Sequence, residues 1–328
     1  MSTPIEFQFK LAPMKTPFRK FATWITTGEV FLLAVLFAAT YAMGHSKALA
    51  NQSLAKQTIS ASPWVKTDYA RIRLIPGAQH SANSAPSDGQ SMARSIGVQI
   101  ELDPGWHTYW RNPGASGVPP RFDWSNSTNV VAAKVLWPAP HRIRDEYGVS
   151  FGYNDLVVFP VHISAENADQ QIGLKLGIDY AVCREICIPV FSELSLELPA
   201  GALASADLMA KVANFEAKVP LPQPKDESKT IGPRIEQTQI QLKDGKPVLA
   251  VTARLGATPA KADIFIEGPE EFFFATPDEP KDIGDGRGLY IVEIKGAETA
   301  EDLAGAKLGC TIVNASGATE HWWVVPKV

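Results

Sequence analysis

Hydrophobic and polar residues alternate along much of the chain between residues 63 and 199. The segments 70–74, 96–102 and 194–198 each place an apolar residue at every second position. A period of two is typical of a β-strand with one buried face. Leu156–Phe159 is instead a continuous apolar run, as in a strand buried on both faces. Turn residues such as Pro104 and Gly105 separate these runs, so the pattern predicts an antiparallel β-sandwich over residues 63–199.

The remaining residues predict a helix, a linker and a second β-rich unit. Leu208, Val212 and Phe215 follow helical spacing within 205–218, and Ser205 stands where a capping residue is favoured. Prolines and charges then fill 220–233, so we interpret residues 200–233 as a helix followed by a linker.

Residues 234–328 predict a smaller second β-sandwich. Its strands are expected at Val248–Ala253, Asp263–Glu267, Leu289–Ile294, Leu308–Val313 and His321–Val325. The whole fold is expected to be all-β.

The first fifty residues are typical of an export signal rather than of a folded domain. Basic residues, Lys15 among them, precede an apolar run from Val30 to Met43, and Ala48-Leu49-Ala50 matches an A-x-A cleavage pattern. The run is shorter than the roughly 20 residues that span a bilayer as a helix. We predict a signal peptide over residues 1–50, with an uncleaved membrane anchor as the alternative and Met14 as a second candidate start. The mature protein is then expected in the periplasm.

Charge narrows the class of partner. The net charge is −4, yet the first fifty residues carry five basic residues against two glutamates, which leaves −7 on the other 278. A body this acidic has no surplus of positive charge to neutralise phosphates, which argues against nucleic acid as a partner. No motif for a small-molecule substrate is evident either.

The candidate chemistry lies in Tyr180–Pro189, which contains Cys183 and Cys187 in a C-x3-C spacing. Closing so short a loop removes little chain entropy, roughly 2 kcal/mol before any strain is subtracted. A purely stabilising role is therefore weak, and a switch between dithiol and disulfide suits the pair better. A local structural disulfide stays open as an alternative, as does a metal site, for which Cu(I) is the least unsuitable ion. The third cysteine, Cys310, lies in an apolar stretch and is expected to be a buried, inert thiol.

Several segments in a fixed order resemble one known family. Tyr180–Pro189 resembles the redox segment of the N-terminal periplasmic domain of the DsbD/ScsB family of thiol:disulfide interchange proteins. Gly105–Gly114 resembles that domain's W-x-x-Y-W-x-x-P-G block, and Pro119–Trp124 and Val135–Pro140 follow in the family's order. Asp145–Gly148 resembles its acidic cap segment.

The resemblance implies an immunoglobulin-like β-sandwich and a set of residue roles. Cys187 would form mixed disulfides with partners and Cys183 would resolve them. Tyr147 would lie over the pair as a cap, with Tyr153 as the alternative cap. Asp145 and Glu146 would be nearby acids that tune the thiol pKa or relay a proton.

The same resemblance implies partners and no bound cofactor beyond the redox-active cysteine pair. Electrons would come from a separate membrane electron-donor protein and pass to thioredoxin-fold periplasmic proteins, since the sequence shows no multi-span membrane domain of its own. The competing hypothesis is a non-catalytic periplasmic binding module that holds Cu(I) or a protein partner.

The aromatic and histidine residues near the first block are given structural roles. We interpret Trp106, Tyr109 and Trp110 as core packing rather than as a docking surface. His107, like the other histidines, is expected to be structural.

Overall fold

The computed structural model describes residues 58–79, 94–145, 148–226, 232–256, 261–277 and 279–327. These residues belong to one compact unit. Among them, no helix is long and apolar enough to cross a membrane. The predicted signal peptide lies outside the described residues.

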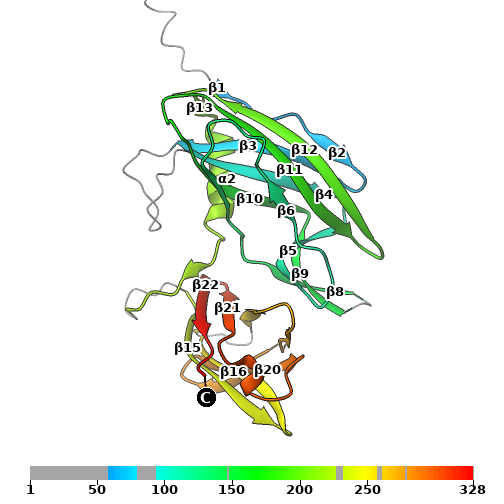
Figure 1. The fold of residues 1–328 in the computed structure, drawn as a ribbon, viewed down its shortest axis with the longest axis vertical. Helices are drawn as coiled ribbons and strands as arrows, with labels where there is room; N and C mark the ends of the chain where they lie inside the picture. The colour runs from blue at the N-terminus through cyan, green and yellow to red at the C-terminus, as the bar shows by residue number, and fades with distance from the viewer. Residues whose placement is uncertain are drawn as a thin grey trace, which may run out of the picture. The chain divides into compact units, whose positions relative to one another are not determined.

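The redox candidate segment belongs to a first β-sandwich, as the alternating pattern predicted (Figure 1). One sheet has the order β2-β3-β4-β10-β7, and the other has the order β12-β11-β5-β9-β8 with β6 also pairing with β11. The strands of the first sheet are β2 (Val65–Thr67), β3 (Ala70–Gln79), β4 (Arg94–Leu102), β10 (Leu156–Ser164) and β7 (Ala132–Val135). Those of the second are β12 (Cys187–Leu198), β11 (Ile172–Cys183), β5 (His107–Gly114), β9 (Gly148–Asn154), β8 (His141–Asp145) and β6 (Arg121–Asp123). The short strands β1 (Thr58–Ile59) and β13 (Leu203–Ala204) form a separate parallel pair.

A second sandwich follows, also as predicted. Its sheets have the orders β14-β22-β21-β17 and β15-β16-β20-β18, with β19 pairing with β20. The first of these comprises β14 (Leu221–Pro222), β22 (Gly317–Val324), β21 (Lys307–Asn314) and β17 (Asp263–Glu267). The other comprises β15 (Arg234–Lys243), β16 (Lys246–Arg254), β20 (Arg287–Lys295), β18 (Phe273–Ala275) and β19 (Lys281–Gly284), and a 3-10 turn, η3, spans Glu301–Leu303. All five strands expected in this half of the chain are present.

The apolar positions of the alternating segments form the two cores. Ile72 and Leu74 of β3, with Val98 and Ile100 of β4, are wholly buried in the first core. Leu249, Val251 and the other inward residues of β16 lie in the second core. Val157 and Val158 of β10 are both fully buried, which confirms the prediction of a strand covered on both faces.

The expected helix is α2 (Ala206–Glu216), and it supplies the cover for one face of β10. It packs against β3 and β10 (Figure 1). Its residue Val212 is buried against Ile75 and Val158. Ser205 does occupy the N-cap position with extended backbone angles, but its side chain makes no capping hydrogen bond. The helix therefore begins where predicted, while its tertiary contacts rather than its cap stabilise it.

The predicted linker departs from the expected irregular structure at one point. Leu221–Pro222 forms β14, which pairs in parallel with Thr319–Glu320 of β22. A proline is tolerated there because β14 is at the edge of its sheet and the missing N–H breaks no central ladder. A strand of the second sandwich therefore lies within the segment that we interpreted as a linker.

Candidate functional site

The two cysteines form a disulfide at the end of the β11–β12 hairpin. Cys183 ends β11, Cys187 begins β12, and the two are direct register partners with Cα atoms 4.1 Å apart. Directly opposed residues on antiparallel strands place their side chains on the same face of the sheet, so the hairpin brings the sulfur atoms together. The C-x3-C spacing is therefore the local geometry of a three-residue hairpin connection.

The two cysteines differ sharply in their exposure. Cys183 is only 1% exposed, in a small buried cluster with Tyr109 and Ala181. Cys187 is exposed to solvent. The neighbouring Arg184 and Glu185 are also exposed and pair with each other at 3.1 Å. A molecule arriving from solvent can therefore reach Cys187 and not Cys183.

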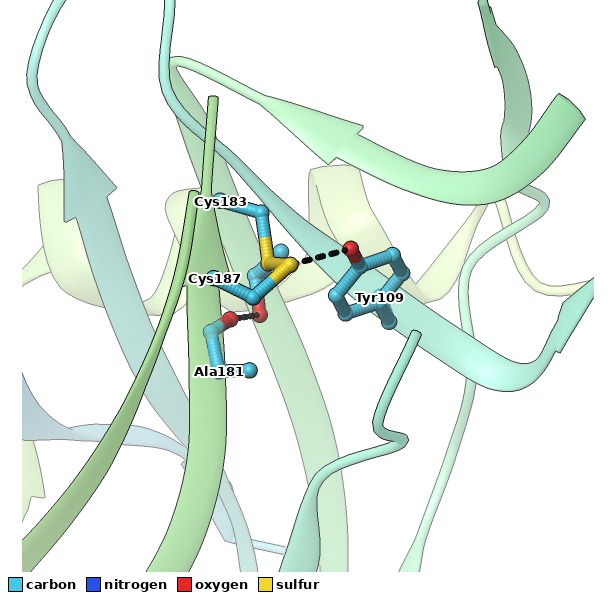
Figure 2. The surroundings of a disulfide bond; sticks show 5 residues. Tyr109, Ala181, Cys183 and Cys187 are labelled. Carbon is cyan, nitrogen blue, oxygen red and sulfur yellow. Dashed lines mark hydrogen bonds between the residues drawn. A yellow bond between two sulfur atoms is a disulfide. The ribbon is translucent and has the colours of Figure 1, made fainter. Parts of the chain in front are cut away.

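Tyr109 is a polar neighbour of the disulfide. Its hydroxyl lies 3.2 Å from the Sγ atom of Cys187, and because a disulfide sulfur carries no hydrogen, the phenol is the donor (Figure 2). The ring is buried, and a Cβ atom on Gly117 would lie 2.4 Å from it, so only glycine allows this loop to approach so closely. Burial, followed by the charge of Asp145, raises the pKa of Tyr109 to about 12. The phenol therefore keeps its proton at physiological pH.

His107 lies on the same face of the sheet as Tyr109. It is the register partner of Cys183 across β5 and β11, and its ring meets that of Tyr109 edge-on, with centroids 5.3 Å apart. It is 4% exposed, and its Nε2 atom has no hydrogen-bond partner among the described residues. Burial lowers its pKa below 6.5, against an opposing effect of Asp145 and together with the charge of His141. A neutral imidazole therefore lies beside the disulfide.

The structure brings some of the sequence-predicted site residues together and not others. Asp145, at the end of β8, acts electrostatically on both His107 and Tyr109, so it lies near the site. Glu146 and Tyr147 lie outside the described residues. Tyr153, the alternative cap, is directed into the core instead, where its hydroxyl donates to the carbonyl oxygen of Pro138 at 2.7 Å.

The aromatic block Trp106–Trp110 is buried, as the core-packing interpretation predicted. That interpretation missed the second role of Tyr109, which is both buried and in contact with the disulfide. It also treated His107 as structural without reference to the site. The signal that could have found both is their spacing: residues 107 and 109 of one strand share a face, which here is the face of Cys183.

The remaining cysteine does not join the site. Cys310 is a free thiol, 1% exposed, within the core of the second sandwich. Burial raises its pKa well above the ordinary value. An unreactive buried thiol is what the sequence predicted.

A buried neutral histidine makes the stability of the site depend on pH. Because the folded state of His107 takes up a proton less readily than the unfolded state, stability is fully present above about pH 6.5 and falls as the pH drops below it. His141 and His321 have pKa values lowered mainly by burial and act in the same direction. Each histidine contributes at most about 1.4 kcal/mol per pH unit to the slope of the free energy of unfolding against pH.

We expect urea unfolding to show this loss of stability between pH 7.5 and pH 5.5. In His107→Gln protein the slope should be smaller, because one of the protons taken up on unfolding is removed. An unchanged slope would mean that His107 is protonated equally in the folded and unfolded states.

The sandwich that carries this disulfide is similar to known proteins. Residues 72–199 match the family model described as "Thiol:disulfide interchange protein DsbD, N-terminal". Residues 72–199 are therefore similar to the N-terminal domain of DsbD, which confirms the resemblance stated from the motifs.

A solved structure has a similar fold. It is the N-terminal periplasmic domain of ScsB from Proteus mirabilis, with a TM-score of 0.61 and 20% sequence identity. The match covers 83% of this chain and 100% of that one, so the fold likeness extends beyond the segment that the family model covers. No curated protein matches the chain.

Proposed function

We propose that this protein relays electrons in the periplasm by dithiol–disulfide exchange with thioredoxin-fold partners. The observation that carries the proposal is the unequal exposure of the disulfide, with Cys187 open to solvent and Cys183 buried. Exchange requires a partner thiolate to approach one sulfur in line with the S–S bond while the other sulfur leaves. The site offers one sulfur for attack and keeps the other for the internal step.

Reduction of the protein proceeds in two successive thiol–disulfide exchange steps. A donor thiolate attacks the Sγ atom of Cys187, the Cys183–Cys187 bond breaks, and Cys183 leaves as a thiolate that then takes up a proton. The second thiol of the donor loses its proton and attacks the donor sulfur of the mixed disulfide. The donor becomes a disulfide and Cys187 is released as a thiolate, so two electrons have moved to this protein.

Oxidation reverses these roles with an acceptor. The Cys187 thiolate attacks the acceptor disulfide, and the acceptor's leaving sulfur takes up a proton. Cys183 then loses its proton and attacks Cys187, which reforms the internal disulfide and releases the acceptor as a dithiol. His107, neutral and on the same face as Cys183, is suited to accept the proton that Cys183 loses.

Tyr109 would stabilise the charge that forms on Cys187. Its hydroxyl already points at the Sγ atom and remains protonated at physiological pH, so it can donate to a thiolate without rearrangement. Asp145 would act on the same groups through its charge. Tyr147 and Glu146, expected as cap and second acid, keep those proposed roles.

The partners follow from the family and from the chemistry. A DsbD N-terminal domain supports thioredoxin-fold proteins as acceptors, and a membrane protein that delivers electrons as the donor. The periplasmic location of the domain with a similar fold supports the same compartment for this chain. No bound cofactor is required, because the cysteine pair carries both electrons.

The experiment that tests this proposal is the reduction potential of the Cys183–Cys187 pair. The protein is equilibrated with glutathione or dithiothreitol redox buffers, and free thiols are then labelled and counted. We expect a value of roughly −120 to −270 mV, the range of working thiol–disulfide proteins. A value below about −300 mV would contradict the proposal and identify a structural disulfide.

A further inference from the structure

Strand β17 is part of the second sandwich, yet each of its five residues contacts the sheet that carries the disulfide. Phe265, at its centre, is fully buried and belongs to the core of the first sandwich. Its ring meets those of Trp110 and Phe151 edge-on, at centroid distances of 5.8 and 4.8 Å. The first core is therefore completed by a residue from the second sandwich.

The polar contacts at one end of β17 converge on Arg142 of strand β8. The Nε atom of Arg142 donates to Asp263 at 2.6 Å, and its Nη2 atom donates to the carbonyl oxygen of Ile264 at 3.1 Å. Further bonds reach the carbonyl oxygens of Thr276 and Pro277. The Arg142 side chain is only 5% exposed, so these bonds form in a largely water-free contact.

The other end of β17 is held by strand β5. Arg111 donates from Nε and Nη2 to the two carboxylate oxygens of Glu267 at 2.9 and 2.8 Å, and Nη2 also reaches Glu320 of β22. Asn112 donates to the carbonyl oxygen of Ile266 at 2.7 Å. A bidentate arginine–carboxylate pair fixes orientation as well as distance.

These anchors lie on the two strands that carry Tyr109 and Asp145, the neighbours of the disulfide. Arg111 follows Tyr109 by two residues on β5, and Arg142 precedes Asp145 by three residues on β8. Trp110, against which Phe265 packs, faces the side of the sheet opposite to Tyr109. Phe265 of β17 therefore packs on the face opposite to Tyr109, while Arg111 reaches β17 from the irregular stretch of β5 that follows Tyr109.

We propose that the second sandwich is a positioning element of the disulfide site. The contacts of β17 with β5 and β8 hold these two strands in place, and this fixes the distance between the Tyr109 hydroxyl and the Sγ atom of Cys187. The role assigned to Tyr109 rests on the proposed function, but the positioning itself does not require a partner protein.

The test removes the charges that β17 presents while keeping the shapes of its side chains. Asp263→Asn and Glu267→Gln are combined in the full-length protein. The matched control is Glu236→Gln, which removes a carboxylate from an arginine pair with Arg254 inside the second sandwich, on β15 rather than β17. The conservative Glu267→Asp variant keeps the charge.

Two readouts are taken without any partner protein: the reduction potential of the cysteine pair and the alkylation rate of Cys187 by iodoacetamide in the reduced protein. We expect the double variant to shift the midpoint of the redox equilibrium and to change the alkylation rate several-fold. The Glu236→Gln control should match the wild type, and Glu267→Asp should restore most of the wild-type rate. Glu267→Gln alone carries the same expectation if the double variant does not fold.

A merely structural role for β17 would lower the melting temperature and leave both readouts unchanged, and that outcome would overturn the inference. Failure of the proposed function has a different signature. In that case the wild-type potential lies below the working range, whatever the β17 variants do.

Discussion

Replacing Cys187 by serine is expected to abolish thiol–disulfide exchange, whereas replacing Cys183 should trap the reaction half-way. Without Cys187 the exposed sulfur is lost, and the buried Cys183 cannot be reached from solvent. Without Cys183 the mixed disulfide between Cys187 and its partner still forms, but no internal thiol remains to resolve it. The two variants therefore fail at different steps.

The measurement uses a thioredoxin-fold protein as the partner and non-reducing electrophoresis as the readout. Cys183→Ser protein should accumulate a covalent complex that disappears on addition of dithiothreitol, and Cys187→Ser protein should show none. Cys310→Ser is the control, because that thiol is buried in the second core and should not affect exchange. Full activity of the Cys187→Ser variant would refute the proposed mechanism, as would a complex formed equally by both single variants.

The second large effect is expected from Tyr109→Phe, which removes one oxygen atom and leaves the ring in place. Hydrogen bonds to charged groups contribute about 1.5–3 kcal/mol. Loss of the phenol should therefore raise the pKa of the Cys187 thiol in the reduced protein by about one to two units. The rate of exchange at neutral pH should fall by roughly 3- to 10-fold, because the loss of thiolate is partly offset by the higher intrinsic nucleophilicity of a more basic thiolate.

The thiol pKa is measured by the pH dependence of alkylation in reduced protein, and the exchange rate by stopped-flow fluorescence. Tyr153→Phe is the matched control, because it also removes a buried phenol with one hydrogen bond, but on the core side of the sheet. It should cost some stability and leave the thiol pKa unchanged. Equal effects of the two substitutions would show that Tyr109 acts only through packing.

Much of the fold could be predicted because each strand has a recognisable pattern of apolar residues within its own sequence. A strand with one buried face requires apolar residues at every second position, as in segments 70–74 and 96–102, and these are β3 and β4. The helix 205–218 was found by its spacing in the same way. The edge strand Leu221–Pro222 was not, since two residues have no period and proline argues against a strand.

The redox pair itself was also predictable, because its geometry is local. Residues four apart can meet only across a tight connection, and the hairpin between β11 and β12 provides it. Which of the two sulfurs faces solvent was not derivable from spacing. That asymmetry depends on Tyr109 and the strands that cover Cys183, which are distant in sequence.

The strand pattern, the two-sandwich architecture and the cysteine pair were thus predictable, because each depends on residues that are near neighbours along the chain. The surroundings of the disulfide were not, because they depend on contacts between residues far apart in sequence. Tyr109 and Cys187 are 78 residues apart, and Arg142 and Asp263 are 121 apart. Contacts of that kind depend on the order of strands in a sheet and on how sheets pack. A period of two does not encode either, because it gives every strand the same inward and outward faces.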